Sequence, residues 1–160
     1  LYYIFPAYCA NGAPVIFGGG RSIDSGKLFI DGKPLFGSHK TIRGFVAGLA
    51  IGTFVGWLQE AIAPVAGFPR GSVLLGFMLS LGAMIGDLAG SFLKRRLSLD
   101  PGAPLPIIDQ IDFTLMALLM ATLVKPPTLI MAIIILVLTI PIHLLINVLA
   151  YLFGLKKTPW

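Results

Sequence analysis

Charged side chains are scarce in this sequence, and their scarcity decides its class. Only 12% of its 160 residues are charged, whereas 56% are hydrophobic. A soluble domain of this size exposes too much surface for so few charges to cover. We therefore predict an all-α integral membrane protein. No polar stretch is long enough for a second domain, so a single membrane-embedded domain is expected over residues 1–160.

Cysteine is almost absent as well. With Cys9 as the single cysteine, the chain can form neither an intrachain disulfide nor a cysteine-only metal site. No Ser/His/Asp or Cys/His arrangement has a serviceable spacing, which disfavours hydrolysis through a covalent enzyme intermediate. The formal net charge of +5 does not predict a nucleic-acid partner. Its cations cluster just outside apolar segments, where topology signals and anionic headgroups account for them.

Five apolar segments approach the roughly 20 residues that a helix needs to cross a membrane. They cover residues 1–17, 44–63, 72–93, 111–124 and 128–153. The fourth is short by itself and is expected to extend over residues 105–110. The first lacks a basic leader and a small-residue cleavage site, so we interpret it as a retained membrane helix and not as a signal peptide. The sequence thus predicts five transmembrane helices.

The cations predict how these helices are oriented. Ten of the twelve Lys and Arg residues lie between the first and second segments, between the third and fourth, or after the fifth. Only Arg70 and Lys125 lie in the other connections. The positive-inside rule then places the N-terminus outside and the C-terminus in the cytosol. We expect a multi-pass protein of the cell membrane whose two long loops are cytosolic.

Glycine recurs every four residues in the second and third segments. The two sets are Gly44, Gly48, Gly52 and Gly56, and Gly82, Gly86 and Gly90. Four-residue spacing makes a smooth strip on which another backbone can lie closely. We predict that these helices pack on each other within one chain; a dimer contact is the alternative, and the oligomeric state stays open.

The first long loop contains a turn signal and a basic segment. Asp31-Gly32 lies between two short apolar runs and suits a type I′ turn, which needs positive φ at both positions, so a small cytosolic β-hairpin is predicted. The loop then passes through Lys40, Thr41 and Arg43 into the second helix. Free N–H groups and the helix dipole favour a phosphate at such an N-terminus.

Four of the seven acidic residues lie close together in the sequence, as Asp87, Asp100, Asp109 and Asp112. Asp109 and Asp112 are three residues apart and share one helix face. Carboxylates together with phosphate oxygens form the hard oxygen shell that suits Mg²⁺. The alternative for Asp109 and Asp112 is a pair of solvated caps at a helix N-terminus, and Asp100 before Pro101 is typical of a turn.

Cations accompany these acids. Ser91 and Lys94 share the helix face of Asp87, and Arg95 and Arg96 follow directly. Three consecutive cations at a membrane boundary are explained by topology alone, whereas beside acids they also suit a triphosphate or a lipid phosphate. The pattern therefore indicates magnesium-dependent chemistry on phosphates at the cytosolic surface.

A series of motifs supports one family. They are Pro6-Ala-Tyr-Cys-Ala-Asn11, Asp31-Gly-Lys-Pro-Leu-Phe-Gly37, His39-Lys-Thr-Ile-Arg-Gly44, Gly86-Asp87, Ser91-Phe-Leu-Lys-Arg-Arg96, Pro101-Gly102, Asp109-Gln-Ile-Asp-Phe113 and Lys156-Lys-Thr-Pro-Trp160. In this order, and over nearly the whole chain, they resemble the archaeal CDP-archaeol synthases. The resemblance implies a CTP-dependent nucleotidyltransferase. Its reaction would join CTP to digeranylgeranylglyceryl phosphate, an unsaturated ether-lipid phosphate, and release pyrophosphate with Mg²⁺ as cofactor.

The resemblance also implies roles for individual residues. The catalytic set would be Asp87, Lys94, Asp109 and Asp112, with the three aspartates as metal ligands. Contacts to the nucleotide and to phosphates would come from Lys40, Thr41, Arg43, Ser91, Arg95 and Arg96. The attacking phosphate oxygen is already ionised at neutral pH, so what this chemistry needs is positioning and charge screening.

Two alternatives remain. A phosphatidate-type cytidylyltransferase acting on a diacyl lipid has the same chemistry, because apolar helices tolerate acyl and prenyl chains alike. A small cation transporter is the rival from another class. Transporters tend to show inverted repeats and polar residues at the membrane midplane, whereas these five segments show no evident repeat and the acids gather at the cytosolic end.

Overall fold

The computed structural model describes residues 1–101, 103–156 and 158. A short 3₁₀ turn, η1 (Tyr2–Ile4), leads into five α-helices: α1 (Phe5–Phe17), α2 (Ile42–Ala66), α3 (Val73–Arg96), α4 (Ile108–Ala121) and α5 (Leu129–Leu152). No strand is present in the described part of the chain. The all-α class is thereby confirmed. Gly102, Lys157, Pro159 and Trp160, which belong to motifs quoted above, lie outside the described residues.

The three long helices begin at hydroxyl side chains. The oxygens of Thr41, Ser72 and Thr128 each accept a hydrogen bond from the backbone N–H three residues on, at 3.1, 3.0 and 3.2 Å. These caps satisfy N–H groups that have no partner inside the helix. α2 ends at Gly67, whose φ of 67° is the left-handed conformation that glycine adopts without steric cost. Local sequence therefore sets these helix ends.

The five helices fall into two groups by length. α2, α3 and α5 are long and apolar enough to cross a membrane. α1 and α4 contain 13 and 14 residues, which at 1.5 Å per residue makes them about 20 Å long, short of a hydrocarbon core of about 30 Å. The expected extension of the fourth segment is only partly present, because α4 begins at Ile108, directly after Pro106 and an Ile107 with φ 70°.

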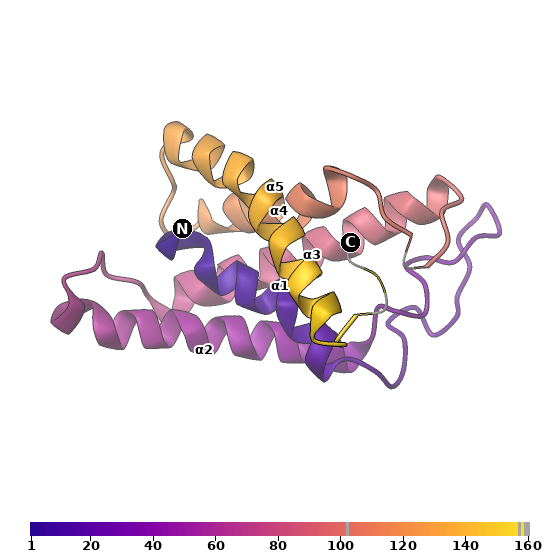
Figure 1. Ribbon diagram of the computed structural model, residues 1–160, viewed down its shortest axis with the longest axis horizontal. Helices are drawn as coiled ribbons and strands as arrows, with labels where there is room; N and C mark the ends of the chain where they lie inside the picture. Colours follow the sequence, from indigo (N-terminus) through magenta and orange to yellow (C-terminus); the bar gives the residue numbers. More distant parts are fainter. Residues whose placement is uncertain (102, 157, 159–160) are drawn as a thin grey trace.

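The helices form a bundle with the short members inside (Figure 1). α1 packs against α2 and α3, α4 packs along α3, and α5 crosses obliquely over α1 and α4. Ile4, Ala7 and Ala10 at the start of the chain, and Ala117 and Ala121 in α4, are fully buried. In its most apolar stretch α5 is only 11% buried, against 50% for α3. The outer helices thus present their apolar surface to lipid.

The glycine strips lie where helices meet. A Cβ on Gly56 would lie 2.5 Å from the Cα of Gly76, so α2 and α3 touch backbone to backbone. In α3, Gly82 and Gly86 lie against the α4 backbone, and Gly90 lies against the carboxylate of Asp112. Packing within one chain is thus confirmed, and α2 does contact α3, but the α3 strip faces α4 and not the α2 strip. The α3 strip also brings α4, with its two aspartates, close to Asp87.

The predicted hairpin is not confirmed as a pair of strands. An isolated antiparallel bridge joins Leu28 to Pro34, and the Phe29 N–H donates to the Lys33 carbonyl at 2.8 Å. Gly32 has a φ of 75°, whereas Asp31 is not among the residues with positive φ. The type I′ turn was therefore the wrong choice. The chain closes through a three-residue turn that needs only one left-handed residue, and glycine supplies it.

Replacing Gly86 by alanine is expected to separate α3 from α4. The added Cβ would clash with the Asp112 carbonyl oxygen and lie 2.7 Å from the Cα of Phe113, and backbone cannot move aside as a side chain can. We expect a loss of about 1–3 kcal/mol in stability, typical of overpacking. Thermal unfolding in detergent measures it.

Gly12→Ala is the matched control for that experiment. Gly12 lies inside α1 and has no atom within 4 Å of an added Cβ. Alanine is the better helix former, so this variant should be unchanged or slightly stabilised. Equal melting temperatures for G86A and G12A would contradict the importance of the α3–α4 contact.

Candidate active site

Both long loops lie at one end of the bundle, as Figure 1 shows for residues 18–41, 97–101 and 103–107. This end carries the basic residues of the first loop and the three cations that end α3. At the opposite end, the Lys125 ammonium group donates to the Arg70 carbonyl at 3.2 Å, so the two outlying cations lie together. The separation of charge that the sequence indicated is therefore present in three dimensions.

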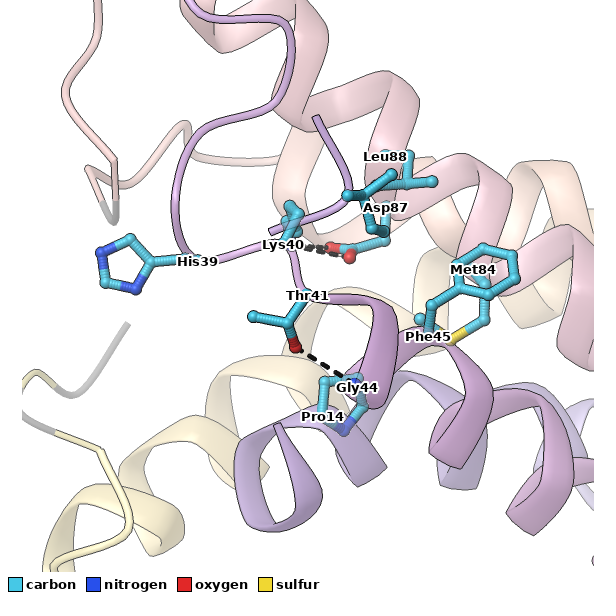
Figure 2. Close-up of a pocket in the computed structure, with 10 residues that line it drawn as sticks. Pro14, His39, Lys40, Thr41, Gly44, Phe45, Met84, Asp87 and Leu88 are labelled. Atoms are coloured by element: carbon cyan, nitrogen blue, oxygen red, sulfur yellow. Dashed lines mark hydrogen bonds and ion pairs between the residues drawn. The ribbon is translucent and has the colours of Figure 1, made fainter. Parts of the chain in front are cut away.

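An ion pair joins the first loop to α3. The ammonium group of Lys40 lies 2.7 and 2.6 Å from the two carboxylate oxygens of Asp87, and each side chain is about one-quarter exposed. Figure 2 shows the lysine, which directly precedes the Thr41 cap of α2, pointing to the aspartate on α3. A residue expected to contact the nucleotide and a residue expected to bind metal thus meet in one pair.

A small cavity of about 40 Å³ lies beside this pair. Its wall includes Pro14 of α1, His39 and Thr41 of the loop, and Met84 of α3 (Figure 2). The space holds a few water molecules but not a nucleotide.

A second ion pair lies where α3 and α4 meet. The Lys94 ammonium group lies 2.9 Å from one carboxylate oxygen of Asp109 and 3.4 Å from the Ala103 carbonyl oxygen. The other Asp109 oxygen accepts a hydrogen bond from the Leu105 N–H at 2.9 Å. Asp109 therefore holds the turn before α4, as a capping residue does, and faces a cation at the same time.

Asp112 is the third aspartate at this end of the bundle, beside Asp87 and Asp109. One of its oxygens accepts a hydrogen bond from the Phe113 N–H at 2.6 Å, and the other fills the space beside Gly90 of α3. The charges of Asp87 and Asp109 both act on this carboxylate. Gly90 has no side chain, and this absence is what lets Asp112 lie against α3.

The three aspartates offer the right donor type for Mg²⁺ but are not gathered as a ligand cluster. Among the residues that the structure describes, no three His, Cys, Asp or Glu side chains converge closely enough to hold a metal ion. Two of the three carboxylates are instead neutralised by Lys40 and Lys94. The chemistry of the donors fits a hard divalent cation, which would have to displace these ammonium groups.

Arg96 is occupied by the first loop. Its guanidinium group lies 4.8 and 4.7 Å from the ring centroids of Phe29 and Phe92, and bonds to the Asp31 carboxylate at 2.9 Å and the Pro34 carbonyl at 2.5 Å. Cation–π contacts and a charge-assisted hydrogen bond together make a strong attachment. This arginine fastens the tip of the loop to the end of α3.

Arg95 points elsewhere and is almost fully buried. It is 4% exposed, and one nitrogen donates to the Asp100 carbonyl at 3.0 Å. In the described part of the chain its Nε and Nη1 have no hydrogen-bond partner. Arg95 is also one of the residues that line a cavity of about 220 Å³, together with Lys33, Ser98 and Pro101, among others. Buried donors without acceptors are costly, and an anion would satisfy them.

The remaining predicted residues differ in their availability. Arg43 is exposed on the first turn of α2, and Ser91 is buried one turn before Arg95. The Thr41 hydroxyl is engaged as the α2 cap, and the Ile42 N–H donates to the Arg21 carbonyl at 3.1 Å. The N-terminus of α2 therefore has fewer free donors for a phosphate than the sequence suggested.

Asp24 is a structural residue that the sequence reading missed. It is 5% exposed and accepts hydrogen bonds from the backbone N–H groups of Gly26, Phe36 and Gly37 at 3.1, 3.1 and 2.9 Å. Burial by itself raises the pKa of this carboxyl, but the hydrogen bonds lower it to about 2. An aspartate two residues before a glycine is a turn signal that could have found it.

Lys156 is the second residue that was missed. Its ammonium group donates to the Asn147 side-chain oxygen at 3.1 Å, and burial lowers the pKa of the lysine. The charges of Asp109, Lys40 and Lys94 act on it as well. In the sequence Lys156 is a topology signal and part of the C-terminal family motif, but nothing in its spacing reveals that the chain folds back after α5.

Fold and site together define a helical membrane protein with a charged centre at one end of its bundle. Its sequence matches the CarS-like family, described as CDP-archaeol synthase, over residues 1–160. The chain belongs to this family. The resemblance drawn from the motifs is thereby confirmed.

Curated relatives agree with this assignment. The CDP-archaeol synthase of Pyrococcus furiosus is 47% identical over 161 residues, covering 99% of this chain and 95% of the relative. That of Methanocaldococcus jannaschii is 44% identical over 168 residues, covering 100% and 95%. A solved structure described as an intramembrane enzyme for archaeal membrane lipid biosynthesis superposes with a TM-score of 0.81, at 38% identity, covering 92% of this chain and 91% of that one.

Arg96→Met is expected to release the tip of the first loop, because it removes the bond to Asp31 and both ring contacts. Hydrogen exchange in residues 27–36 should rise about tenfold or more. The control is Arg21→Met, since Arg21 is exposed and its side chain bonds, among the described residues, to nearby Ser25 at 3.0 Å. Equal exchange in both variants would show that Arg96 does not hold the loop.

Proposed function

We propose that this protein transfers the cytidylyl group of CTP to the phosphate of digeranylgeranylglyceryl phosphate, giving a CDP-archaeol-type lipid and pyrophosphate. Family membership and the likeness to an intramembrane enzyme of archaeal lipid synthesis support the reaction class. The observation that carries it furthest is the Lys40–Asp87 pair, which joins a basic loop to an acidic helix face at one end of an apolar bundle.

The proposed membrane arrangement has five crossings, with the N-terminus outside, the C-terminus in the cytosol and the site on the cytosolic side. α2, α3 and α5 are long enough to cross alone. α1 and α4 are shorter, but their buried faces lie inside the bundle, where they need not match the lipid thickness. The cations gathered at the loop end support the orientation.

Asp87, Asp109 and Asp112 are the proposed Mg²⁺ ligands. When bound, the cation would neutralise phosphate charge as pyrophosphate leaves. Lys40 and Lys94, which now neutralise two of these carboxylates, would then be free to hold phosphate oxygens. The same ammonium groups thus pair with the partly buried carboxylates, and they would screen phosphate charge once Mg²⁺ took over those carboxylates.

The other residues have proposed roles that follow from their surroundings. Arg95 lines a cavity and, within the described residues, has two buried donors without a partner, so it suits the phosphates of CTP or the pyrophosphate. Ser91 lies on the same helix one turn away, while Thr41 and Arg43 lie where the first loop joins α2. For Arg96 the contacts favour holding the loop over binding phosphate. The attacking phosphate needs no general base, because it is already ionised.

Asp87→Asn is expected to reduce turnover by about 100-fold or more while the protein stays folded, since the amide keeps the shape but loses the charge. The rate of pyrophosphate release at saturating CTP and Mg²⁺ measures it. Glu60→Gln is the control, because Glu60 lies at the far end of α2 and accepts from the Val73 N–H, a bond the amide can also make. Wild-type turnover in D87N would show that Asp87 has no role in the reaction.

The reaction itself is tested with detergent-purified protein, CTP and Mg²⁺. Parallel samples contain the ether-lipid phosphate, phosphatidate or no lipid, and EDTA is added to one set. We expect release only with the ether-lipid phosphate, and none with EDTA. Equal or faster release with phosphatidate would overturn the lipid assignment but keep the chemistry. If the protein is folded and no lipid phosphate supports release, the proposed enzymatic activity is wrong, and ion flux in liposomes would then be measured.

A further inference from the structure

The carboxylate of Asp24 ties the beginning of the first loop to its end. One oxygen accepts a hydrogen bond from the Gly26 N–H at 3.1 Å, and the other accepts from the N–H groups of Phe36 and Gly37 at 3.1 and 2.9 Å. Asp24 is only 5% exposed, so water has little access to these bonds. Hydrogen bonds to an ionised carboxylate are stronger than those between neutral groups. Asp24 therefore fixes the backbone shortly before Lys40.

Backbone hydrogen bonds carry this link on to Lys40. The Ile23 N–H, next to Asp24, donates to the Lys40 carbonyl at 2.8 Å. The Lys40 N–H donates in turn to the Gly37 carbonyl at 3.2 Å. From this position the ammonium group of Lys40 reaches both carboxylate oxygens of Asp87, at 2.7 and 2.6 Å (Figure 2). The ion pair between loop and helix thus depends on backbone that Asp24 holds.

Gly37 also lies against the end of α3. A Cβ at this position would lie 3.6 Å from the Nη1 of Arg95. Arg95 is 4% exposed, and its Nη1 has no hydrogen-bond partner in the part of the chain that the structure describes. The segment 37–40 therefore has Arg95 beside its first residue and Asp87 beside its last. The carboxylate of Asp24 sets the position of the loop relative to both.

We propose that Asp24 is a positioning residue for CTP, which holds the loop segment 36–40 so that Lys40 and Arg95 can bind phosphates of the nucleotide. The inference rests on the proposed function and deepens it, because it assigns this segment to one of the two substrates. The first loop lies beyond the end of the apolar helices (Figure 1), on the side from which a water-soluble substrate arrives. The lipid acceptor keeps its chains in the bilayer. Asp24 acts through the loop and touches neither substrate.

A purely structural role is the competing explanation. Loss of a buried, hydrogen-bonded carboxylate lowers stability whether or not the loop binds CTP. A loss of stability alone reduces the amount of folded enzyme, and with it the apparent kcat, but leaves the KM of the folded molecules unchanged. In the proposed role the loop occupies its binding arrangement for only part of the time, and the apparent affinity for CTP falls by that fraction. The two explanations therefore separate when KM is compared with kcat.

Asp24→Asn is the informative variant, because it keeps the size of the side chain but replaces one of two acceptors by a donor. Whichever way the amide is turned, its NH2 group faces backbone N–H groups that the carboxylate accepted. Asp31→Asn is the matched control, since it makes the same change in the same loop. There one oxygen accepts from both the Lys33 N–H and the Arg96 guanidinium group, so an amide oxygen can replace it.

Steady-state pyrophosphate release is measured in mixed micelles for wild type, D24N and D31N, with CTP and lipid phosphate varied in turn. For D24N we expect the KM for CTP to rise about tenfold or more, because unsatisfied buried N–H groups disfavour the loop arrangement by such a factor. The KM for lipid phosphate should stay within about twofold. D31N should match wild type in both constants. Hydrogen exchange over residues 36–40 should rise in D24N and not in D31N.

Three results would overturn the proposal. They are an unchanged KM for CTP in folded D24N, an equal rise in both Michaelis constants, and a D31N variant as impaired as D24N. If D24N does not fold in detergent, Asp24→Glu is tested in its place, because it keeps the charge and both acceptors but shifts them by one methylene group. It should raise the KM for CTP by a smaller factor, and an unchanged value counts against the proposal. Absence of lipid-dependent release in the wild type would instead overturn the proposed function, which the three results above leave standing.

Discussion

The close approach of α3 to α4 is the constraint on which the site depends. Gly82 and Gly86 let the α4 backbone lie directly on α3, and Gly90 leaves room for the Asp112 carboxylate. Without this approach, carboxylates carried by different helices could not share an environment. Membrane helices gain little from hydrophobic association because the surrounding lipid is equally apolar, so packing of small residues sets their separation. The glycines therefore determine chemistry as well as shape.

Ion pairs then distribute charge over this scaffold. Asp87 and Asp109 each lie against a lysine, one from the first loop and one from α3 itself. Partly buried carboxylates without a partner are unfavourable, so the lysines stabilise the folded arrangement. In the proposed reaction, the same arrangement keeps positive charge near the place where the two anionic substrates meet. Stability of the fold and screening of substrate charge thus both favour lysines beside these carboxylates.

Much of this architecture could be predicted from the sequence, because it depends on local signals. Apolar length identified five helices, hydroxyl residues such as Thr41 and Ser72 begin two of them, and the four-residue glycine spacing anticipated the contact surfaces. The turn type at Asp31-Gly32 was wrong, since both I′ and three-residue turns accept this pair. The sequence showed that the first and fourth segments are short, but the expected extension of the fourth over residues 105–110 is only partly present, because composition does not show where a helix begins inside a bundle.

The pairing of the site residues could be predicted only in part. Family motifs identified Asp87, Asp109 and Asp112, but not which lysine neutralises which carboxylate, since that depends on how the loops fold. Arg96 illustrates the limit. From the sequence it is one of three equivalent cations, and only the neighbouring rings of Phe29 and Phe92 assign it to the loop. Asp24 and Lys156 were missed because their partners are distant or follow a reversal of the chain.

The length of α3 beyond Asp87 has a consequence for access. Nine residues separate Asp87 from Arg96 at the end of the helix, or about 13 Å of rise. Asp87 therefore lies well below the rim formed by the loops that Arg96 fastens. In the proposed reaction, the water-soluble substrate descends to the level of the membrane surface, and the lipid keeps its chains in the bilayer. Recessing the reactive centre spares the enzyme the cost of lifting a hydrophobic molecule into water.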